Sequence, residues 1–314
     1  MKIIETQRHP LKFYATILFG FLFFAALGSL LIFIGLDNEA NNQSKNKHII
    51  MPIFGSLVYL FAIWMVYSYW KNSPKITIDK NTIKIGNETF RLNSIKDVIL
   101  TGKMPFRFII SFPMEGTAIL FNDGREKILF DDMYSNSYEV KSFLEQVIIK
   151  KQEFKISTLK KVNKNELRFE NIEIFKGNQF ISLRGISFWG LIGFFTILFL
   201  GKETSMTLGG IIFFTLFGSF WFVLHSWFMH YFELTNKFLI IRNHIFIWKI
   251  KVYSFSDIKE VVFETQGKQP NCMRVITNDF RNKLYPAGTL SDKTWLEMKK
   301  RLETRGVKVR NECI

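Results

Sequence analysis

The sequence predicts an α+β membrane protein with four transmembrane helices in two hairpins, each hairpin followed by an antiparallel β-domain that ends in a helix. Three observations predict this fold: four long apolar blocks, short strand-like runs after each pair of blocks, and local matches between the two halves. The chain has 314 residues, of which 48% are hydrophobic and 22% are charged. This composition excludes a disordered chain and a disulfide scaffold, and the pooling of apolar residues in blocks excludes an ordinary soluble enzyme.

The four apolar blocks predict transmembrane helices at about residues 13–36, 49–70, 184–200 and 206–232. About 20 apolar residues cross a bilayer as a helix, so the first, second and fourth blocks are long enough. The third block is shorter, and it spans if the guanidinium of Arg184 reaches the headgroups. A cleaved signal peptide is the competing interpretation of the first block. Cleavage there would leave the apolar run SLLIFIGL at a new N-terminus, so we expect an uncleaved anchor.

Short polar links join the blocks in pairs and indicate their orientation. Residues 37–48 and 201–205 leave room only for antiparallel neighbours, so each pair forms a hairpin. Of the 42 Lys and Arg residues, three lie in these links: Lys45, Lys47 and Lys202. Positive charge near helix ends stays on the cytoplasmic side. We therefore expect a multi-pass protein of the inner membrane with both termini and both β-domains in the cytoplasm, where a structural disulfide is not expected.

Local sequence matches predict that the second half of the chain repeats the first. SIKDVIL at residues 94–100 matches DIKEVVF at 257–263, an offset of 163. NDGREK at 122–127 matches NDFRNK at 278–283, an offset of 156. A nearly constant offset is expected after a tandem duplication, with about seven residues lost from the second copy between the two motifs.

The polar segments predict β-domains at residues 71–150 and 233–314, separated by a basic linker at 151–183. Short runs of β-branched and aromatic residues indicate the strands. The first domain has seven such runs, at 75–79, 82–86, 88–92, 95–100, 106–112, 117–121 and 126–130. The second has six, KFLII, HIFIWK (244–249), KVYSF, IKEVVF, CMRVIT and RNKLYP, so we expect it to lack one strand.

A closing helix is predicted at the end of each β-domain. Ser135 or Asn136 can cap the first of these helices. Ser291 can cap the second, and the helical spacing of its apolar residues places three of them in the core: Trp295, Met298 and Leu302.

Six or seven antiparallel strands closed by one helix is the order of a pleckstrin-homology-like (PH-like) domain. The whole chain resembles the bacterial PH-domain membrane proteins, in which a pair of transmembrane helices precedes such a domain. The resemblance covers residues 13–150 and 180–308, through the junctions YSYWKNSPKITIDKNTIKI and MHYFELTNKFLIIRNHIFIWK, the SIKDV and DIKEV strands and the closing helices. It implies a cytosolic β-domain held at the membrane for binding or assembly rather than catalysis, without implying recognition of phosphoinositides.

The sequence offers no candidate residues for catalysis, so we expect no enzyme activity, metal or cofactor. The five His residues lack HExxH spacing. His225 and His230 diverge by about 140° around a helix, which favours a structural role over a functional one. Asp131 and Asp132 fit a solvated turn before a helix. The Asn-Asp-x-Arg-x-Lys motif of the two repeats fits a hairpin turn, with phosphate or headgroup contact as the alternative.

Clusters of basic residues are the remaining functional signal. Juxtamembrane Lys and Arg attract anionic lipid at about 1 kcal/mol per residue near the surface. Positive-inside charge and solvated helix faces explain the same residues without a ligand. Nucleic-acid binding is not expected, because topology accounts for most of the net charge of +15. The candidate contacts for anionic lipid or a partner are Lys150, Lys151, Lys155, Lys160, Lys161, Arg184, Lys299, Lys300 and Arg301.

Together these features predict a non-catalytic inner-membrane scaffold that presents two cytosolic PH-like domains for protein interaction, self-assembly or contact with anionic lipid headgroups. Its expected partners are membrane lipids and either further copies of the chain or partner membrane proteins. A subunit of a larger transport or export complex is the alternative. A membrane-bound enzyme acting on lipid is a third interpretation, and it needs polar residues that converge at the inner headgroups: Arg184, His225, His230 and Glu233.

Overall fold

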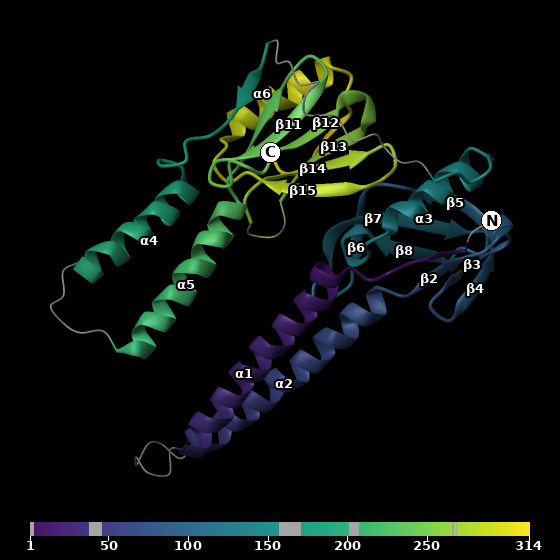
Figure 1. The fold of residues 1–314 in the computed structure, drawn as a ribbon. Coiled ribbons are helices and arrows are strands. Elements are labelled where there is room, and N and C mark those ends of the chain that lie inside the picture. Colours follow the sequence, from purple (N-terminus) through teal and green to yellow (C-terminus); the bar gives the residue numbers. More distant parts are fainter. Residues whose placement is uncertain (1–2, 38–45, 157–170, 201–206, 266, 268) are drawn as a thin grey trace. The chain divides into compact units, whose positions relative to one another are not determined.

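Apolar helices and mainly antiparallel sheets alternate along the chain, giving an α+β structure in the computed structural model (Figure 1). The structure describes residues 3–37, 46–156, 171–200, 207–265, 267 and 269–314. The chain divides into two compact units, which we call unit 1 (Met1–Ser157) and unit 2 (Thr158–Ile314). Each unit contains its own apolar helices, its own sheets and its own hydrophobic core.

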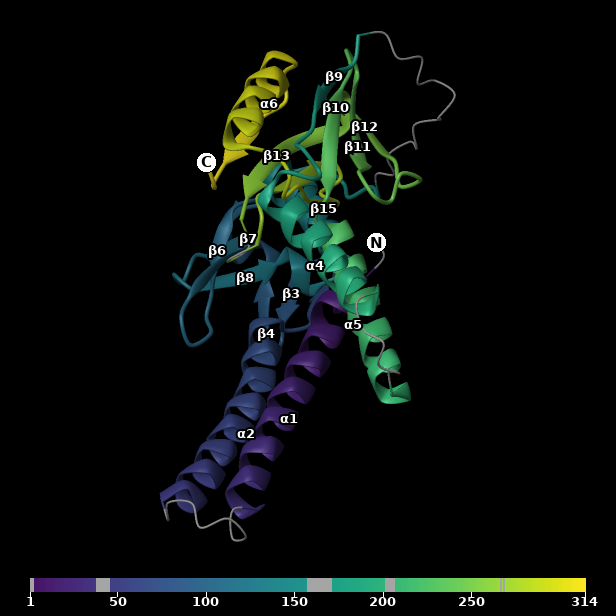
Figure 2. The same cartoon turned by 90° about the vertical axis from the view of Figure 1, so that its left-hand side faces the viewer.

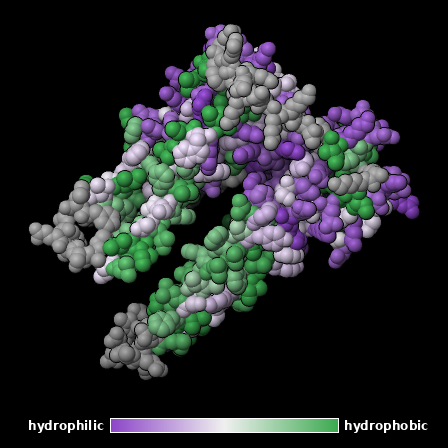
Figure 3. Space-filling model, viewed as in Figure 1, coloured by the Kyte–Doolittle hydropathy of each residue, from purple (hydrophilic) through white to green (hydrophobic). Residues whose placement is uncertain are grey.

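Three helical segments of the described chain are long and apolar enough to cross a membrane. In unit 1 these are Pro10–Leu36, which combines the π-helical turn η1 (Pro10–Ala15) with α1 (Thr16–Asp37), and His48–Asn72 of α2 (Asn46–Asn72). In unit 2 the segment is α5 (Leu208–Trp227). The fourth predicted span corresponds to α4 (Leu183–Leu200), whose apolar stretch Leu183–Ile197 is shorter. Hydrophobic side chains cover the surfaces of these helices (Figure 3).

Glycines allow α1 and α2 to pack closely. Gly28 and Gly55 face each other, and a Cβ at Gly28 would lie 2.9 Å from the ring of Tyr59. At the far end of the pair, a Cβ at Gly35 would lie 2.4 Å from the ring of Pro52. Side chains at these positions would force the helices apart, so the glycines determine the separation of the hairpin.

Unit 1 has two four-stranded sheets. The first has the order β1–β2–β3–β4, all antiparallel, with strands Ile4–Glu5, Ile76–Ile78, Thr82–Ile85 and Glu88–Arg91. In the second, β7 pairs with β5, β6 and β8; the strands are β5 Ile95–Ile99, β6 Lys103–Phe106, β7 Phe112–Phe121 and β8 Glu126–Phe130. The helical segments that complete the unit are η3 (Leu92–Ser94), η4 (Asp131–Met133), α3 (Ser137–Phe143) and η5 (Leu144–Ile149).

Unit 2 also has two four-stranded sheets. The first has the order β12–β11–β10–β9, with β9 Glu173–Phe175, β10 His230–Leu234, β11 Phe238–Asn243 and β12 Lys251–Ser254. The second has the order β15–β14–β13–β16, with β13 Ile258–Glu264, β14 Cys272–Thr277, β15 Asn282–Pro286 and β16 Val309–Asn311. The turn η7 (Phe255–Asp257) joins the sheets, and α6 (Asp292–Thr304) packs on the core.

The two units share details of strand order and register. In each, the apolar hairpin connects an edge strand to its neighbour, β1 to β2 and β9 to β10. A β-bulge interrupts the second sheet between Ile95 and Asp97 in unit 1, and between Ile258 and Glu260 in unit 2. Among the described residues of unit 2, no strand corresponds to β6. Both units nevertheless have eight described strands, because β16 of unit 2, which pairs parallel with β13, has no counterpart in the described part of unit 1.

The predicted closing helix of unit 2 is present with its expected cap and core face. Ser291 Oγ accepts a hydrogen bond from the backbone N–H of Thr294, and the core side is formed by Trp295, Met298 and Leu302, all buried. In unit 1 the predicted cap has another role. The Asn136 side chain accepts from the backbone N–H of Gln7 and donates to the carbonyl of Glu5, so it fixes the N-terminal strand instead of the helix.

Several predicted boundaries are wrong. The helix predicted to end at 232 ends at Trp227, and β10 begins at His230. Four of the five residues of β10 are buried, so the apolar run continues from helix into strand without a change in composition. The tail at residues 1–70 contains β1, and the linker at 151–183 contains β9. The strands predicted at 106–112 and 244–249 are largely loops.

Candidate functional site at the helix–sheet junctions

In unit 1, Arg8 binds the end of α2 where the apolar helices join the sheets, a region we call the junction. The Arg8 Nε and Nη2 atoms donate to the carbonyl of Ser73 at 3.1 and 3.0 Å. Its guanidinium carbon lies 4.0 Å from the centroid of the Trp70 ring. The Tyr134 hydroxyl donates to the carbonyl of Pro74 at 2.5 Å. These contacts join the N-terminal segment, the end of α2 and the region after η4 at the junction.

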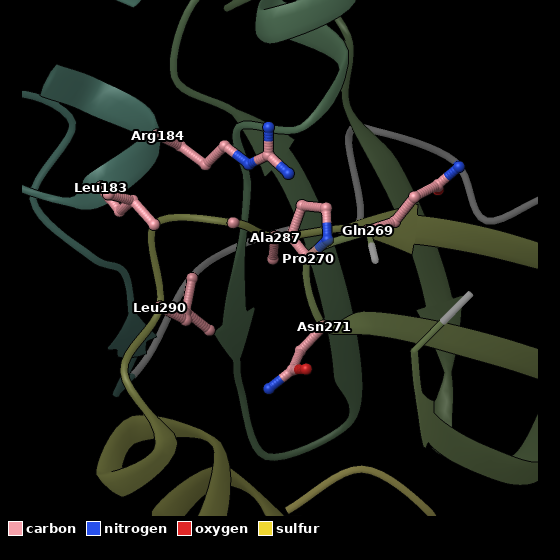
Figure 4. Close-up of a pocket in the computed structure, with 8 residues that line it drawn as sticks. Leu183, Arg184, Gln269, Pro270, Asn271, Ala287 and Leu290 are labelled. Carbon is pink, nitrogen blue, oxygen red and sulfur yellow. The ribbon is translucent and has the colours of Figure 1, made fainter. Parts of the chain in front are cut away.

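In unit 2, Arg184 contributes to the wall of a cavity at the junction. The cavity has a volume of about 300 Å³ (Figure 4), and its lining residues are Leu183, Arg184, Gln269, Pro270, Asn271, Ala287, Gly288 and Leu290. A Cβ at Gly288 would lie 2.8 Å from Arg184 Cγ, so this glycine leaves room for the arginine stem. The guanidinium carbon lies 5.1 Å from the centroid of the Phe228 ring. Within the described part of the chain, no carboxylate forms an ion pair with Arg184.

The cavity has one cationic group, and both polar and apolar residues line its walls. Figure 4 shows the side chains of Gln269 and Asn271 pointing away from the Arg184 guanidinium. The three polar side chains therefore do not converge on one ligand atom. Such a cavity can accept the charged part of an amphipathic molecule beside Arg184 and an apolar part against Leu183 and Leu290, but it lacks the arrangement of a catalytic pocket.

The residues required for a lipid-acting enzyme do not converge either. The His225 Nε2 atom lies 3.4 Å from Ser187 Oγ, and its ring stacks on Trp221. The His230 Nδ1 atom lies 2.9 Å from the carbonyl oxygen of Pro286, and burial lowers the pKa of His230 to about 4. The Glu233 carboxylate accepts from Arg242 Nε at 2.9 Å. Each of these groups has a separate partner, and His230 and Glu233 lie on opposite faces of β10.

The predicted basic residues that the structure describes belong to different elements of the two units. Lys150, Lys151 and Lys155 are exposed at the end of η5, where Lys150 pairs with Glu145 at 3.4 Å. Lys160 and Lys161 lie outside the described residues. The structure thus groups only the first three of these lysines, and one of them already has an acidic partner.

Lys299, Lys300 and Arg301 lie on α6, on the side of the unit 2 sheets away from α4 and α5 (Figures 1 and 2). Arg305 lies one turn beyond Arg301, and its Nε donates to the carbonyl of Thr235, directly after β10. Thr235 is five residues from His230, where β10 begins, so the two lie about 16 Å apart along the strand. The end of α6 is therefore far from the junction. This part of α6 lies on the side of the unit 2 sheets opposite α4 and α5.

Both arginines at the end of α6 bind the same carboxylate. The distances are 3.2 Å from Arg301 Nε to Glu173 Oε2 and 2.8 Å from Arg305 Nη2 to Glu173 Oε1. Glu173 begins β9, the strand that leads into α4. Arg301 therefore has a structural role in holding this strand against α6. Lys299 pairs with Glu303 at 3.8 Å, and Lys300 is exposed.

The repeated Asn-Asp-x-Arg-x-Lys motif forms hairpin turns. Arg125 pairs with Asp123 at 2.7 Å and with Glu88 at 2.8 Å. In unit 2, Arg281 lies 3.3 Å from Asp279. These ion pairs favour the turn interpretation over phosphate contact. Among the described residues, no group of His, Cys, Asp or Glu side chains could hold a metal ion.

Two apolar loops at the junctions are missing from the sequence-based list of sites. Residues 107–111 connect β6 to β7, and residues 244–250 connect β11 to β12. Both expose large apolar side chains beside the helices, Ile109 and Ile110 in the first and Ile247 and Trp248 in the second. An apolar run flanked by cations was the available signal, but the same composition is typical of a strand.

Comparison with known proteins adds no relative: no protein-family model and no curated protein matches the chain.

Proposed function

We propose that the chain is a non-catalytic scaffold of the inner membrane. In this proposal it consists of two tandem units, each a transmembrane hairpin with a PH-like domain on the cytosolic side. The matching strand orders and the matching β-bulges support a tandem duplication. Unit 1 has β6 where unit 2 has no described strand between β13 and β14, which agrees with the seven-residue change in sequence offset, and unit 2 has in addition the parallel strand β16.

The insertion of each apolar hairpin between adjacent strands carries this proposal. Ile4 pairs with Ile78 across α1 and α2, and Phe175 pairs with Phe232 across α4 and α5. Only residues 6–9 and 73–75 separate the sheet of unit 1 from its helices. Because so few residues intervene, a bilayer around the helices fixes the height and tilt of the sheet. A β-domain held at a fixed height and tilt is better suited to docking a partner than a domain that rotates freely on a flexible linker.

The length of α4 supports a fourth span. Its 18 residues extend about 27 Å as a helix, close to the thickness of the hydrocarbon core of a bilayer. Arg184 is the second residue of α4, where a long cationic side chain can reach the headgroups. In this arrangement the cavity beside Arg184 lies at headgroup level. We propose anionic lipid headgroups as its ligand class.

Assembly with further membrane helices is a second candidate function, favoured by the contrast between the two hairpins. A Cβ built at any of several glycines of α4 and α5 meets no described atom within 4 Å: Gly190, Gly193, Gly209 and Gly218. The glycines of α1 and α2 instead face the neighbouring helix. Small residues allow helices to approach closely. These open positions suit a second copy of the chain or a partner membrane protein, as in a larger transport or export complex.

Cysteine accessibility in intact cells tests the proposed topology. Single cysteines are introduced as Asn42→Cys, Asn122→Cys and Lys300→Cys in a chain carrying Cys272→Ala and Cys313→Ser. We expect a membrane-impermeant maleimide to label position 42 in intact spheroplasts, and positions 122 and 300 only after permeabilisation. Labelling of 122 or 300 in intact spheroplasts contradicts a cytosolic scaffold.

The mass of the complex extracted in native lipid discs tests assembly. A species at a multiple of 37.0 kDa supports self-assembly, and a stoichiometric second protein supports a subunit role. Recovery of the monomer alone contradicts both forms of assembly. The mass of the complex does not test the membrane topology, which the labelling experiment tests separately.

A further inference from the structure

We infer that the 107–111 loop of unit 1 and the 244–250 loop of unit 2 insert into the cytosolic leaflet beside the spanning helices. The occupant of both loop surfaces is the boundary between lipid headgroups and acyl chains. This inference rests on the proposed membrane placement and adds a third membrane contact to each unit besides its two helices.

The 107–111 loop lies along the side of α2. The Phe108 ring centroid lies 4.7 Å from that of Trp64 and 6.2 Å from that of Phe61. Ser68 Oγ and Asn72 Nδ2 both donate to the carbonyl of Arg107, at 3.3 and 2.8 Å. These contacts hold the loop against the last three turns of the helix.

The position of these contacts along α2 places the loop at membrane depth. Asn72 is the last residue of the helix, and Trp64 and Phe61 precede it by about 12 and 17 Å. A hydrocarbon core that begins at His48 takes about 20 residues and extends to Tyr67. Trp64 and Phe61 then lie inside the core, and Phe108 lies beside them. A loop that contacts these residues cannot remain in the aqueous phase.

The tip of the 107–111 loop has the side chains that this location requires. Ile109 is 65% exposed and Ile110 is 78% exposed. Exposure of two isoleucines to water is unfavourable by about 25 cal/mol for each Å² of apolar surface, whereas lipid removes this cost. Arg107 is exposed at the start of the loop, where a guanidinium can reach phosphate groups.

The 244–250 loop also lies against its helix, α5, through different contacts. Asn243 Nδ2 donates to the carbonyl of Ser226 at 2.7 Å, and its Oδ1 accepts from the backbone N–H groups of Ile245 and Phe246. The Phe246 ring lies 6.5 Å from that of Phe222, one and a half turns before the end of the helix. The side chain of Asn243 thus turns the chain back along α5.

The tip of the 244–250 loop is also apolar with adjacent cations. Ile247 is 71% exposed and Trp248 is 70% exposed. Lys249 Nζ lies 4.4 Å from the centroid of the Phe246 ring, and Lys251 is exposed beyond it. Tryptophan favours the interfacial zone of a bilayer, and lysines beside it attract anionic lipid. The loop therefore combines apolar insertion with electrostatic attraction.

The two loops come from different places in the strand order. The first connects β6 to β7 in the second sheet of unit 1, and the second connects β11 to β12 in the first sheet of unit 2. The shared strand plan therefore does not explain their likeness. Both follow from the same physical requirement, since each sheet stands directly on a bilayer and must cover its contact with lipid.

Depth-resolved fluorescence quenching of the full chain in vesicles tests this inference. Single NBD labels are placed through Ile110→Cys and Trp248→Cys, with Asn122→Cys and Lys300→Cys as exposed controls far from the junctions. Leu22→Cys in α1 reports the spanning helices themselves. The vesicles contain phosphatidylethanolamine and phosphatidylglycerol, with a doxyl quencher on the acyl chain either near the headgroup or near the methyl end.

We expect labels at 110 and 248 to have blue-shifted emission and to be quenched most by the doxyl group near the headgroup. The label at 22 is quenched most by the deep doxyl group, and labels at 122 and 300 are quenched by neither. Labels at 110 and 248 that resemble the exposed controls, with position 22 quenched, overturn the inference alone. An unquenched label at 22 overturns the membrane placement. Blue-shifted but unquenched labels at 110 and 248 indicate a protein partner and also contradict lipid insertion.

Discussion

Gly28 and Gly55 face each other across the first hairpin so closely that a Cβ on Gly55 would lie 2.7 Å from the Gly28 carbonyl oxygen. The backbone atoms at this contact cannot move aside without separating the helices. In unit 2, a Cβ on Gly218 of α5 meets no described atom within 4 Å. The two glycines, Gly55 and Gly218, therefore form a matched pair for mutation.

We expect Gly55→Leu to destabilise unit 1 by about 1–3 kcal/mol, because a side chain at this position overpacks the α1–α2 contact. Gly218→Leu in monomeric protein should have little effect on stability. Thermal unfolding of both variants in the same detergent measures the difference. Equal losses of stability would contradict the close approach of α1 and α2.

Gly218→Leu should instead weaken assembly, if the open glycines of α4 and α5 receive another helix. The added side chain keeps that helix away, since close packing depends on small residues. The mass of the complex in native lipid discs gives the result. An unchanged mass for this variant, with assembly present in the unaltered protein, would remove α5 from the interface.

Arg274 and Glu264 form a buried ion pair in the second sheet of unit 2. The Arg274 Nη2 to Glu264 Oε1 distance is 2.8 Å, and each side chain is 1% exposed. Arg274→Met should cost about 3–5 kcal/mol, because the carboxylate of Glu264 loses its partner in a site away from water. Adding Glu264→Leu should recover much of this loss. A double variant as unstable as the single one would show that packing, and not the unpaired charge, causes the effect.

The stability of unit 2 should fall as the pH falls from about 6.5 to about 4. Burial lowers the pKa of His230 to about 4, so below pH 6.5 the unfolded chain binds a proton that the folded chain does not. The loss in the free energy of unfolding reaches about 3 kcal/mol near the pKa of His230 in the folded state and then levels off. Burial lowers the pKa of His244 to about 4 as well, in the same direction. Unfolding temperatures of the unaltered chain across this pH range give the reference.

His230→Gln should flatten this pH dependence, because glutamine does not titrate. His244→Gln should flatten it by a separate amount, and the double variant should lose most of it. Lys300→Gln is the matched control, since Lys300 is exposed on α6 away from both histidines. A pH dependence unchanged in the double variant would assign acid sensitivity to other groups.

Glu173 should contribute to the position of β9 through Arg301 and Arg305. Glu173→Gln keeps the shape of the side chain but removes its charge. We expect the free energy of unfolding to fall by about 1 kcal/mol, because these ion pairs are partly exposed to solvent. Hydrogen exchange at the amides of β9 measures the local effect. Faster exchange at β9 with unchanged exchange at α1 would be the expected pattern, whereas uniform changes would contradict a local role.

The candidate site could be predicted only in part. The sequence pattern singles out Arg184 at the edge of an apolar block, and the structure places it at the junction beside a cavity. Arg301 looked like a free cation in sequence but binds Glu173, because β9 lies within reach of α6 only in the folded unit. The sequence pattern predicts strands at 106–112 and 244–249, where the structure has largely loops. Their apolar residues are exposed next to helices instead of buried in a sheet, and composition does not distinguish these two environments.

The sequence by itself determined the features that depend on local composition and spacing. Long apolar runs identified the helices that can cross a membrane, and the spacing of Trp295, Met298 and Leu302 identified the core face of α6. Only the tertiary structure decided which distant segments pair. Ile4 pairs with Ile78, and Glu173 lies beside Arg305, across more than 70 residues in each case. Such pairings depend on backbone hydrogen bonds and shape, which the local sequence pattern does not encode.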